Sequence, residues 1–387
     1  MDEANIWRVD PDEIAAHLIN YYNDLFTSSN PTVHGETLTH IPPVITEHMN
    51  ESLVAPFHGD EVKDALKQMA PLKARGPDGM PPLFYQHFLG VVDNDVTSSV
   101  LSWLNSGTLP YPLNHTFVTL IPKINNPEFV TQYRPISLCN VLYKIFSKVL
   151  ANRLKKILPS IITEHQSAFA KNRLIMDNIL VAFESLNSMK NMSAGKTGYI
   201  SIKLDMSKAY HRVEWGYLEN VMRKMGFCER WIGLIMVCVK TVTYSIMING
   251  EPQGLIHPTR GIRQGDPLSP FLFLLCTEGL HGLIQHAASA GEIKGFSLCR
   301  RGPTLTHLLF ADDSLLFCRA TVEECRKVIG ILETYEGESG QKVNKNKTAI
   351  FFSKSTEEAT KQQIKVALGL QEIVHFEQYL GVPSLVG

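Results

Sequence analysis

Two adjacent aspartates, Asp312 and Asp313, lie between two short and almost wholly apolar runs within residues 308–317. Each run has the length and composition of a buried β-strand, so the pair is expected at or beside a tight hairpin turn. Repulsion and desolvation would raise the pKa of one carboxyl group or require a cation. A divalent metal relieves both effects, and hard cations such as Mg2+ prefer carboxylate oxygens. An ordinary surface turn is the competing interpretation of the dipeptide alone.

A third carboxylate, that of Asp205, closes the apolar run 199–205, which is predicted to be a strand. The sequence between Asp205 and Asp312 has room for a crossover that brings the two strands together in one sheet. Clustered carboxylates of this kind are what a two-metal site needs, where one ion lowers the pKa of an attacking hydroxyl and the other neutralises the leaving oxygen. A strand-end cap explains Asp205 equally well when it is taken alone.

The glycine-containing segment 261–270 leads into a long apolar helix. Its glycines allow the backbone to approach a flat partner closely. Arg263 and Gln264 offer donors for phosphate groups or base edges, and a helix N-terminus beside them favours an anion. An ordinary capped loop, with Asp266 or Ser269 as the N-cap, explains the same residues without a ligand.

The net charge of −1 conceals an uneven distribution along the chain. Residues 1–64 hold twelve acidic residues against two basic ones, a net charge of −10. Residues 121–175 hold nine Lys and Arg against two Glu, a net charge of +7. That concentration can neutralise a nucleic-acid backbone although the whole chain is nearly neutral. A solvated helix face is the alternative for a local pair such as Lys155 and Lys156.

The bulk properties indicate an intracellular protein, nuclear or cytoplasmic, without a membrane partner. The acidic start lacks a secretory signal, and the longest apolar runs are too short to cross a bilayer. Seven scattered cysteines, an odd number, favour a reducing compartment. None forms a CxxC pair, so we do not expect a structural zinc site.

The periodicity predicts an α+β fold with a small antiparallel sheet covered by helices on one face. Helices are predicted over residues 12–26, 62–69, 83–104, 139–157, 177–189, 215–225, 230–241, 269–289, 322–338 and 356–368. Strands are predicted over residues 117–121, 199–205, 243–248 and 349–353, together with the Asp-Asp hairpin. We divide the chain into a linker and helical extension, a helical segment and a main domain: 1–60, 61–110 and 111–387.

LDMSKAY, GIRQGDPLSPFLF and FADDSLLF occur in this order, and with this spacing they resemble motifs A, B and C of reverse transcriptases. These motifs resemble the form that they take in LINE-type non-LTR retrotransposons of plants. Supporting matches are the finger motifs at 117–123 and 133–138, motif D at 339–347, the primer grip at 379–383 and an upstream stretch at 76–79. The resemblance covers residues 50–387.

This resemblance implies the fingers and palm of a right-hand polymerase, with a small antiparallel palm sheet packed on helices and the thumb largely absent. The implied activity is that of an RNA-directed DNA polymerase, a nucleotidyltransferase that extends a DNA primer on an RNA template. It would use dNTPs and Mg2+, with Mn2+ as an alternative. A catalytically inactive, truncated retroelement remnant that at most binds nucleic acid is the main alternative. A two-metal phosphodiesterase is a further one, although no nuclease motif is present.

The resemblance also implies roles for residues near the metals. Asp205, Asp312 and Asp313 would be the metal carboxylates, with the backbone carbonyl of Met206 completing the shell. Asp205 and Asp312 are the expected direct ligands, because neighbouring strand residues point in opposite directions. Lys347 would protonate the leaving pyrophosphate.

Five further positions are expected to contact the nucleotide or template. Lys123 and Arg134 would hold the triphosphate, and Gln264 and Gly265 would line the template–nucleotide pair. Tyr210 would place its ring against the sugar, which excludes a ribose 2′-hydroxyl and favours deoxynucleotides. A buried core tyrosine is the alternative for this position.

Two residues depart from the family pattern. His211 stands where the family usually has an acidic residue, and an imidazole there would change the electric field beside the metals. Arg75 replaces the usual proline before the Gly-Pro-Asp-Gly stretch. The departure at His211 favours the inactive alternative.

Overall fold

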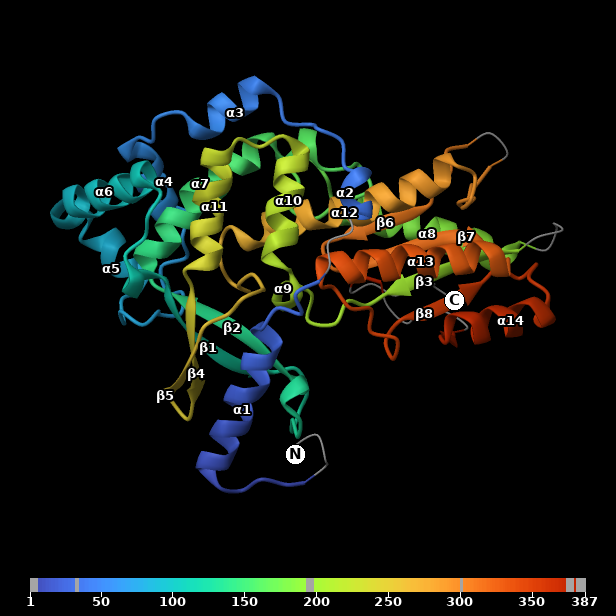
Figure 1. Cartoon of the computed structure of the whole chain (residues 1–387), viewed down its shortest axis with the longest axis horizontal. Helices are drawn as coiled ribbons and strands as arrows, with labels where there is room; N and C mark the ends of the chain where they lie inside the picture. The colour runs from blue at the N-terminus through green and yellow to red at the C-terminus, as the bar shows by residue number, and fades with distance from the viewer. Residues whose placement is uncertain (1–5, 32–34, 193–197, 300–301, 374–378, 381–387) are drawn as a thin grey trace. The chain divides into compact units, whose positions relative to one another are not determined.

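The computed structural model describes two compact units, each assembled from separate parts of the sequence. Its described residues are 6–31, 35–192, 198–299, 302–373 and 379–380 (Figure 1). Unit 1 is formed by Met1–Asn30, Val44–Ile157 and Tyr210–Leu272. Unit 2 is formed by Pro31–Pro43, Leu158–Ala209 and Phe273–Gly387.

Unit 1 contains a four-stranded mixed sheet in the order β2–β1–β4–β5. Strand β1 pairs antiparallel with β2 and parallel with β4, and β4 forms an antiparallel hairpin with β5. The strands are β1 (His115–Pro122), β2 (Tyr133–Cys139), β4 (Thr243–Ile248) and β5 (Glu251–Ile256). The parallel pair joins segments more than a hundred residues apart, so the helices between them form the crossover.

The rest of unit 1 is mainly helical (Figure 1). Its helices include α1 (Pro11–Phe26), α3 (Glu47–Val54), α4 (Gly59–Lys67), α5 (Pro82–His87), α6 (Leu89–Ser106), α10 (Trp215–Met225) and α11 (Glu229–Lys240). Unit 1 also holds the 3-10 turns η1 (Tyr111–Asn114) and η2 (Val130–Gln132), and most of the helices α7 (Val141–Ile161) and α9 (Ala209–Arg212).

Helix α1 closes over one part of the unit 1 sheet. Asp10 caps its N-terminus by accepting hydrogen bonds from two backbone amides. Near its C-terminus, Tyr22 and Phe26 are fully buried with Tyr244 and Ile246 of β4. The ring centroids of Phe26 and Tyr244 are 4.8 Å apart. Burial of these aromatic rings stabilises the docking of α1 by several kcal/mol, at roughly 1.5–3 kcal/mol for each large apolar side chain.

Unit 2 contains a five-stranded sheet in the order β6–β7–β3–β8–β9. The first four strands are antiparallel, and the two-residue β9 adds a parallel pair at the edge. The strands are β3 (Tyr199–Leu204), β6 (His307–Phe310), β7 (Asp313–Arg319), β8 (Ala349–Phe352) and β9 (Gln371–Glu372).

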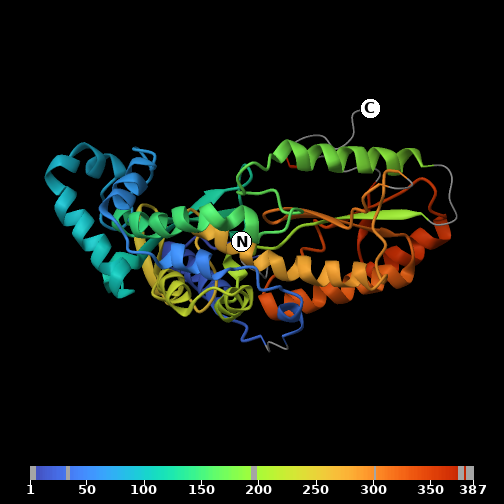
Figure 2. The ribbon, with the colours of Figure 1, turned by 90° about the horizontal axis from the view of Figure 1, so that it is seen from above.

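Helices cover both faces of the unit 2 sheet. In Figure 2 the green α8 lies on one side of the strands and the orange α12 and α13 lie on the other. Leu315 and Phe317 of β7 pack with α8, whereas Leu316 packs with side chains of α12 and α13. The helices are α2 (Glu36–Thr39), α8 (Ile175–Asn191), α12 (Ser269–Ser289), which begins in unit 1, α13 (Val322–Ser339) and α14 (Glu358–Leu368).

The predicted α+β fold with a palm-type sheet packed on helices is confirmed, and two details differ. The expectation of cover on one face was wrong, because five successive residues of β7 are buried, which requires apolar partners on both sides. A second sheet is also present, in unit 1. The proposed boundaries after residues 60 and 110 stay predictions. Within the described residues, no helix is both long enough and apolar enough to span a membrane.

Candidate active site

The predicted acidic hairpin is present between β6 and β7 in unit 2. Phe310 pairs with Asp313, so Ala311 and Asp312 form a two-residue connection. Ala311 adopts a left-handed φ of +53°, a conformation that two-residue hairpins need and that alanine rarely adopts. Its amide donates a hydrogen bond to Oε1 of Gln166 at 3.0 Å, which holds the turn in this conformation.

Asp205 lies beside this turn because β3 pairs with β7. The ladder ends at the pair Leu204–Ser314, one residue before Asp205 and Asp313 would face each other. Burial raises the pKa of Asp313, the nearby carboxylates of Asp312 and Asp205 raise it further, and the Lys203 ammonium opposes them. The structure thus brings the three predicted aspartates together.

The donor chemistry of these three carboxylates suits a divalent cation. Asp312 is exposed, and Asp205 and Asp313 are half-buried, so their oxygens remain accessible from solvent. A cation would stabilise the ionised form of all three groups, and an all-oxygen donor set is the one that Mg2+ and Mn2+ prefer. The assignment of Asp205 and Asp312 as the direct ligands stays a prediction.

The segment that follows Asp205 is fixed by backbone hydrogen bonds to the predicted motif D. The amide of Asn344 donates to the carbonyl of Asp205, and the amide of Ser207 donates to the carbonyl of Lys342, both at 2.8 Å. Met206, between these bonds, bridges to Val343. The expected backbone ligand is therefore held on a short, well-anchored stretch.

Lys347 belongs to the same anchored region. Its side chain is exposed, and its amide donates to the carbonyl of Asn344 at 3.0 Å. The next residue, Thr348, accepts a hydrogen bond from the Asp205 amide through its hydroxyl at 3.3 Å. Sequence reasoning missed Thr348 and Gln166, although both hold the backbone of the acidic cluster.

The two basic residues predicted to hold a triphosphate lie at one end of the β1–β2 hairpin in unit 1. Arg134 of β2 pairs with Ile121 of β1, and its side chain is exposed. Lys123 follows β1 directly, and its Nζ donates to the carbonyl of Thr131 at 3.0 Å. The structure brings this basic pair together.

Gln264 and Gly265 lie against β2 in the same unit. The amide of Ser137 donates to the carbonyl of Gln264 at 2.9 Å. Gly265 has a φ of +110°, and a Cβ there would stand 3.2 Å from the carbonyl oxygen of Ser137. Glycine is therefore required here both by the backbone conformation and by the close approach to β2.

The expectation that Arg263 offers donors to phosphate was wrong. Arg263 is 4% exposed, forms an ion pair with Asp266 at 2.9 Å and lies over the ring of Tyr143. It also donates hydrogen bonds to Asn114 and to the carbonyl of Cys238. All of these partners belong to unit 1, so the guanidinium is a structural group. An acidic residue three positions later was the sequence signal for this pair.

Tyr210 and His211 both belong to unit 1. The carbonyl of Tyr210 accepts a hydrogen bond from the amide of Ile262 at 2.8 Å, and its side chain is half-buried. His211 is buried and packs beside Phe26, with ring centroids 5.6 Å apart. Its predicted influence on bound metals stays a prediction.

The predicted primer grip falls largely outside the described residues. Of residues 379–383, the structure describes only Tyr379 and Leu380. The hydroxyl of Tyr379 donates to Oδ1 of Asn178 in α8 at 2.8 Å.

Comparison with known proteins supports a polymerase origin. The family model described as "Reverse transcriptase (RNA-dependent DNA polymerase)" matches residues 121–382. The chain is 27% identical over 348 residues to "Transposon TX1 uncharacterized 149 kDa protein" of Xenopus laevis, which covers 88% of this chain and 25% of that protein.

Two further relatives extend the comparison. Identity is 29% over 211 residues to "Retrovirus-related Pol polyprotein from type-1 retrotransposable element R2" of Popillia japonica, covering 54% of this chain and 28% of the relative. It is 56% over 68 residues to "Uncharacterized mitochondrial protein AtMg01250" of Arabidopsis thaliana, covering 18% of this chain and 56% of the relative. The chain thus spans about a quarter of the length of the TX1 and R2 proteins.

Members of the matched family are RNA-directed DNA polymerases that bind template and primer and generally depend on metal ions. The match covers more than half of the chain and includes all three predicted aspartates. The chain therefore belongs to the reverse transcriptase family and is related to the polymerases of non-LTR retrotransposons.

Proposed function

We propose that this chain is the RNA-directed DNA polymerase of a non-LTR retrotransposon, which transfers nucleotides from dNTPs to a primer 3′-hydroxyl on an RNA template. The observation that carries this proposal is the gathering of Asp205, Asp312 and Asp313 at one end of the unit 2 sheet, inside the segment that matches the family. The polymerase domain would comprise residues 111–387, after a helical segment, 61–110, and an N-terminal extension, 1–60.

The three carboxylates, with the backbone carbonyl of Met206, would hold Mg2+ or Mn2+. When bound, two such ions lower the pKa of an attacking hydroxyl and neutralise the leaving oxygen. Asp313 carries the clearest support for this role. Its pKa is raised by burial and by two neighbouring carboxylates, so the cluster gains stability from a bound cation.

The proposed nucleotide contacts come from unit 1. Lys123 and Arg134 would bind the triphosphate, since exposed basic side chains at the end of a hairpin form charge-assisted hydrogen bonds to phosphate. Gln264 and Gly265 would line the template–nucleotide pair, on a backbone that the close approach of Gly265 to β2 holds in place. Tyr210 would exclude a ribose 2′-hydroxyl and so select deoxynucleotides.

Lys347 would donate the proton that the leaving pyrophosphate requires. Its ammonium group is exposed, and its backbone is held by the same segment that anchors Asp205. A proton donor fixed in this way contributes roughly 10²–10⁴-fold to a rate.

The seven free cysteines support an intracellular reaction, nuclear or cytoplasmic.

The second candidate is a catalytically inactive remnant that binds nucleic acid. His211 favours it, because this residue replaces the acidic side chain usual in the family and is buried against Phe26. A primed RNA template, dNTPs and Mg2+ distinguish the two. The polymerase proposal requires primer extension by the purified chain that depends on Asp312, tested with Asp312→Ala.

If the wild-type chain does not extend the primer, a binding measurement distinguishes the two candidates. Metal-dependent dNTP binding that Asp312→Ala abolishes, with extension appearing only in His211→Asp, would assign the loss of activity to His211. Template binding without extension, and without metal-dependent dNTP binding, would instead support the remnant.

A further inference from the structure

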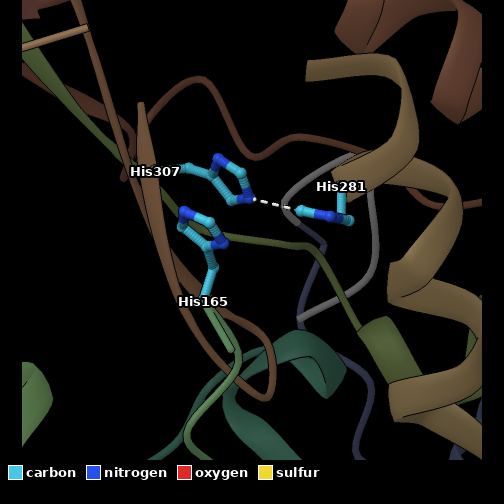
Figure 3. A group of neighbouring side chains, drawn as sticks. All are labelled: His165, His281 and His307. Atoms are coloured by element: carbon cyan, nitrogen blue, oxygen red, sulfur yellow. Dashed lines mark hydrogen bonds between the residues drawn. The ribbon is translucent and has the colours of Figure 1, made fainter. Parts of the chain in front are cut away.

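Three histidines from separate parts of the sequence meet in unit 2 (Figure 3). His165 follows α7, His281 lies in α12 and His307 is the first residue of β6. One potential ligand atom from each lies within 4.8 Å of the other two. Nδ1 of His281 and Nε2 of His307 are already hydrogen-bonded to each other at 2.9 Å.

Threonine hydroxyls orient two of these rings. Oγ1 of Thr163 lies 3.1 Å from Nδ1 of His165, and Oγ1 of Thr306 lies 2.8 Å from Nδ1 of His307. With the hydroxyls as acceptors, both Nδ1 atoms carry the proton and both Nε2 atoms keep a lone pair. Metal-binding histidines generally have their second nitrogen held in this way by an outer group.

The three imidazoles are also kept neutral. Burial, and then the neighbouring rings of the cluster, lower the pKa of His281 to about 4 and that of His307 well below its ordinary value. Burial likewise lowers the pKa of His165. Neutral imidazole is the form that binds metals, so protons do not compete with a metal at neutral pH.

We propose that His165, His281 and His307 bind one divalent transition-metal ion, with Zn2+ as the best fit. Three imidazole nitrogens suit Zn2+ rather than Mg2+, which prefers oxygen ligands. A water molecule would take the fourth position. His165 and Thr306 line a groove of about 910 Å3, which gives a hydrated ion access from solvent.

Binding requires a small rearrangement of the rings. Zinc–nitrogen bonds of about 2.0–2.1 Å place tetrahedral ligand nitrogens about 3.3 Å apart. The widest separation in the cluster has to close from at most 4.8 Å. The rings of His165 and His307, stacked with centroids 4.4 Å apart and an angle of 14° between them, have to tilt toward a shared ion. The hydrogen bond between His281 and His307 would be replaced by two metal bonds, and the proton on Nδ1 of His281 would move to its Nε2.

Such an ion would fasten three elements of unit 2. The segment around His165 already runs along β6, because the amide of Leu309 donates to the His165 carbonyl at 2.9 Å. Glu278, one turn before His281 in α12, accepts a hydrogen bond from the Thr163 amide at 3.1 Å. A metal would complete this contact between α12, β6 and the His165 segment. The inference does not depend on the proposed polymerase activity.

Zinc titration of the purified chain, made without a histidine tag and freed of metal, tests the proposal. A chromophoric chelator competes for Zn2+ in millimolar Mg2+, and thermal unfolding is followed in parallel. We expect one tightly bound Zn2+ that raises the unfolding temperature. His281→Gln and His165→Gln should each lose it, whereas His257→Gln, at an exposed position in unit 1, should keep it.

Two further variants separate this site from its surroundings. Thr306→Val should weaken Zn2+ binding by roughly 10- to 100-fold, because it removes the group that orients His307. Asp312→Asn should leave binding unchanged, which excludes the acidic turn as the zinc ligand. Circular dichroism checks that each variant is folded, and the partly exposed His165 and His281 give two independent tests. Equal Zn2+ affinity in the wild type and both histidine variants, or no bound Zn2+ in the wild type, would overturn the proposal.

Discussion

The loop around Arg263 in unit 1 and the Asp312–Asp313 turn in unit 2 are both rich in charge, and the two segments use it differently. Arg263 is buried, but Asp266 and the ring of Tyr143 satisfy its charge within the unit. Asp313 is half-buried next to like charges, and its pKa is raised as a result. A buried charge that the fold satisfies contributes to structure, whereas like charges held side by side are suited to a ligand of opposite charge.

Replacing a carboxylate of the acidic turn should have the largest effect. Asp205→Asn should lower single-nucleotide primer extension by at least about 10³-fold, because metal positioning is worth several kcal/mol and each 1.36 kcal/mol is tenfold in rate. Its free energy of unfolding in urea should stay the same or rise, since a like charge is removed. Glu323→Gln, at an exposed site in α13, is the control. Extension within tenfold of the wild type would remove Asp205 from the proposed metal site.

Replacing Arg263, whose charge is satisfied within the fold, should by contrast lower the stability of the protein. Arg263→Met should lower the free energy of unfolding by about 3–5 kcal/mol, because Asp266 is left buried without its cation. Adding Asp266→Asn should cost less than the sum of the two single changes. Urea unfolding of all three variants measures this coupling. A single-variant cost below about 1 kcal/mol would contradict the structural role of Arg263.

Gly265 tests the role of backbone conformation in the same loop as Arg263. Gly265→Ala should cost about 1–2 kcal/mol of stability, since its φ of +110° is strained for alanine and the new Cβ approaches Ser137. Gly250 is a matched control: its φ is +90°, and a Cβ there meets no atom within 4 Å. Only Gly265→Ala should also reduce primer extension per folded molecule. An equal loss of extension in Gly250→Ala would contradict a specific role.

The pH dependence of Asp313 should give the smallest effect, because solvent screens this partly exposed group. Its folded-state pKa lies above the ordinary value of 3.8, so the stability contributed by its protonated form is lost as pH rises through that folded pKa. Asp313→Asn should therefore gain stability relative to the wild type between acidic and neutral pH. Mg2+ should reduce the difference. A difference that does not change with pH would contradict the raised pKa.

Local patterns were enough to predict several elements of this fold. Helices α10 and α12 and strand β4 have the predicted bounds, because their apolar periodicity is strong. Strand β2 was missed since it contains Pro135, and β5 was missed since nearly all its residues are exposed. In both strands the pairing partner in the sheet, rather than local composition, decides the structure.

Local sequence patterns likewise predict only part of the candidate site. The three aspartates stand in recognisable motifs, so their proximity was predicted. Gln166 holds the amide of Ala311 from 145 positions away, and no local pattern connects them. The three histidines likewise share no spacing that is typical of a metal site. Residues that support a site from distant segments are visible only once the chain is folded.

Helix α1 has a practical consequence for dissecting this protein. The family match begins at residue 121, yet Tyr22 and Phe26 of α1 fill part of the core beside Tyr244. A truncation at the family boundary would leave that aromatic surface facing water and invite self-association. Unit 1 is thus not a portable module at the family boundary, because an upstream helix that carries no motif itself fills part of its core.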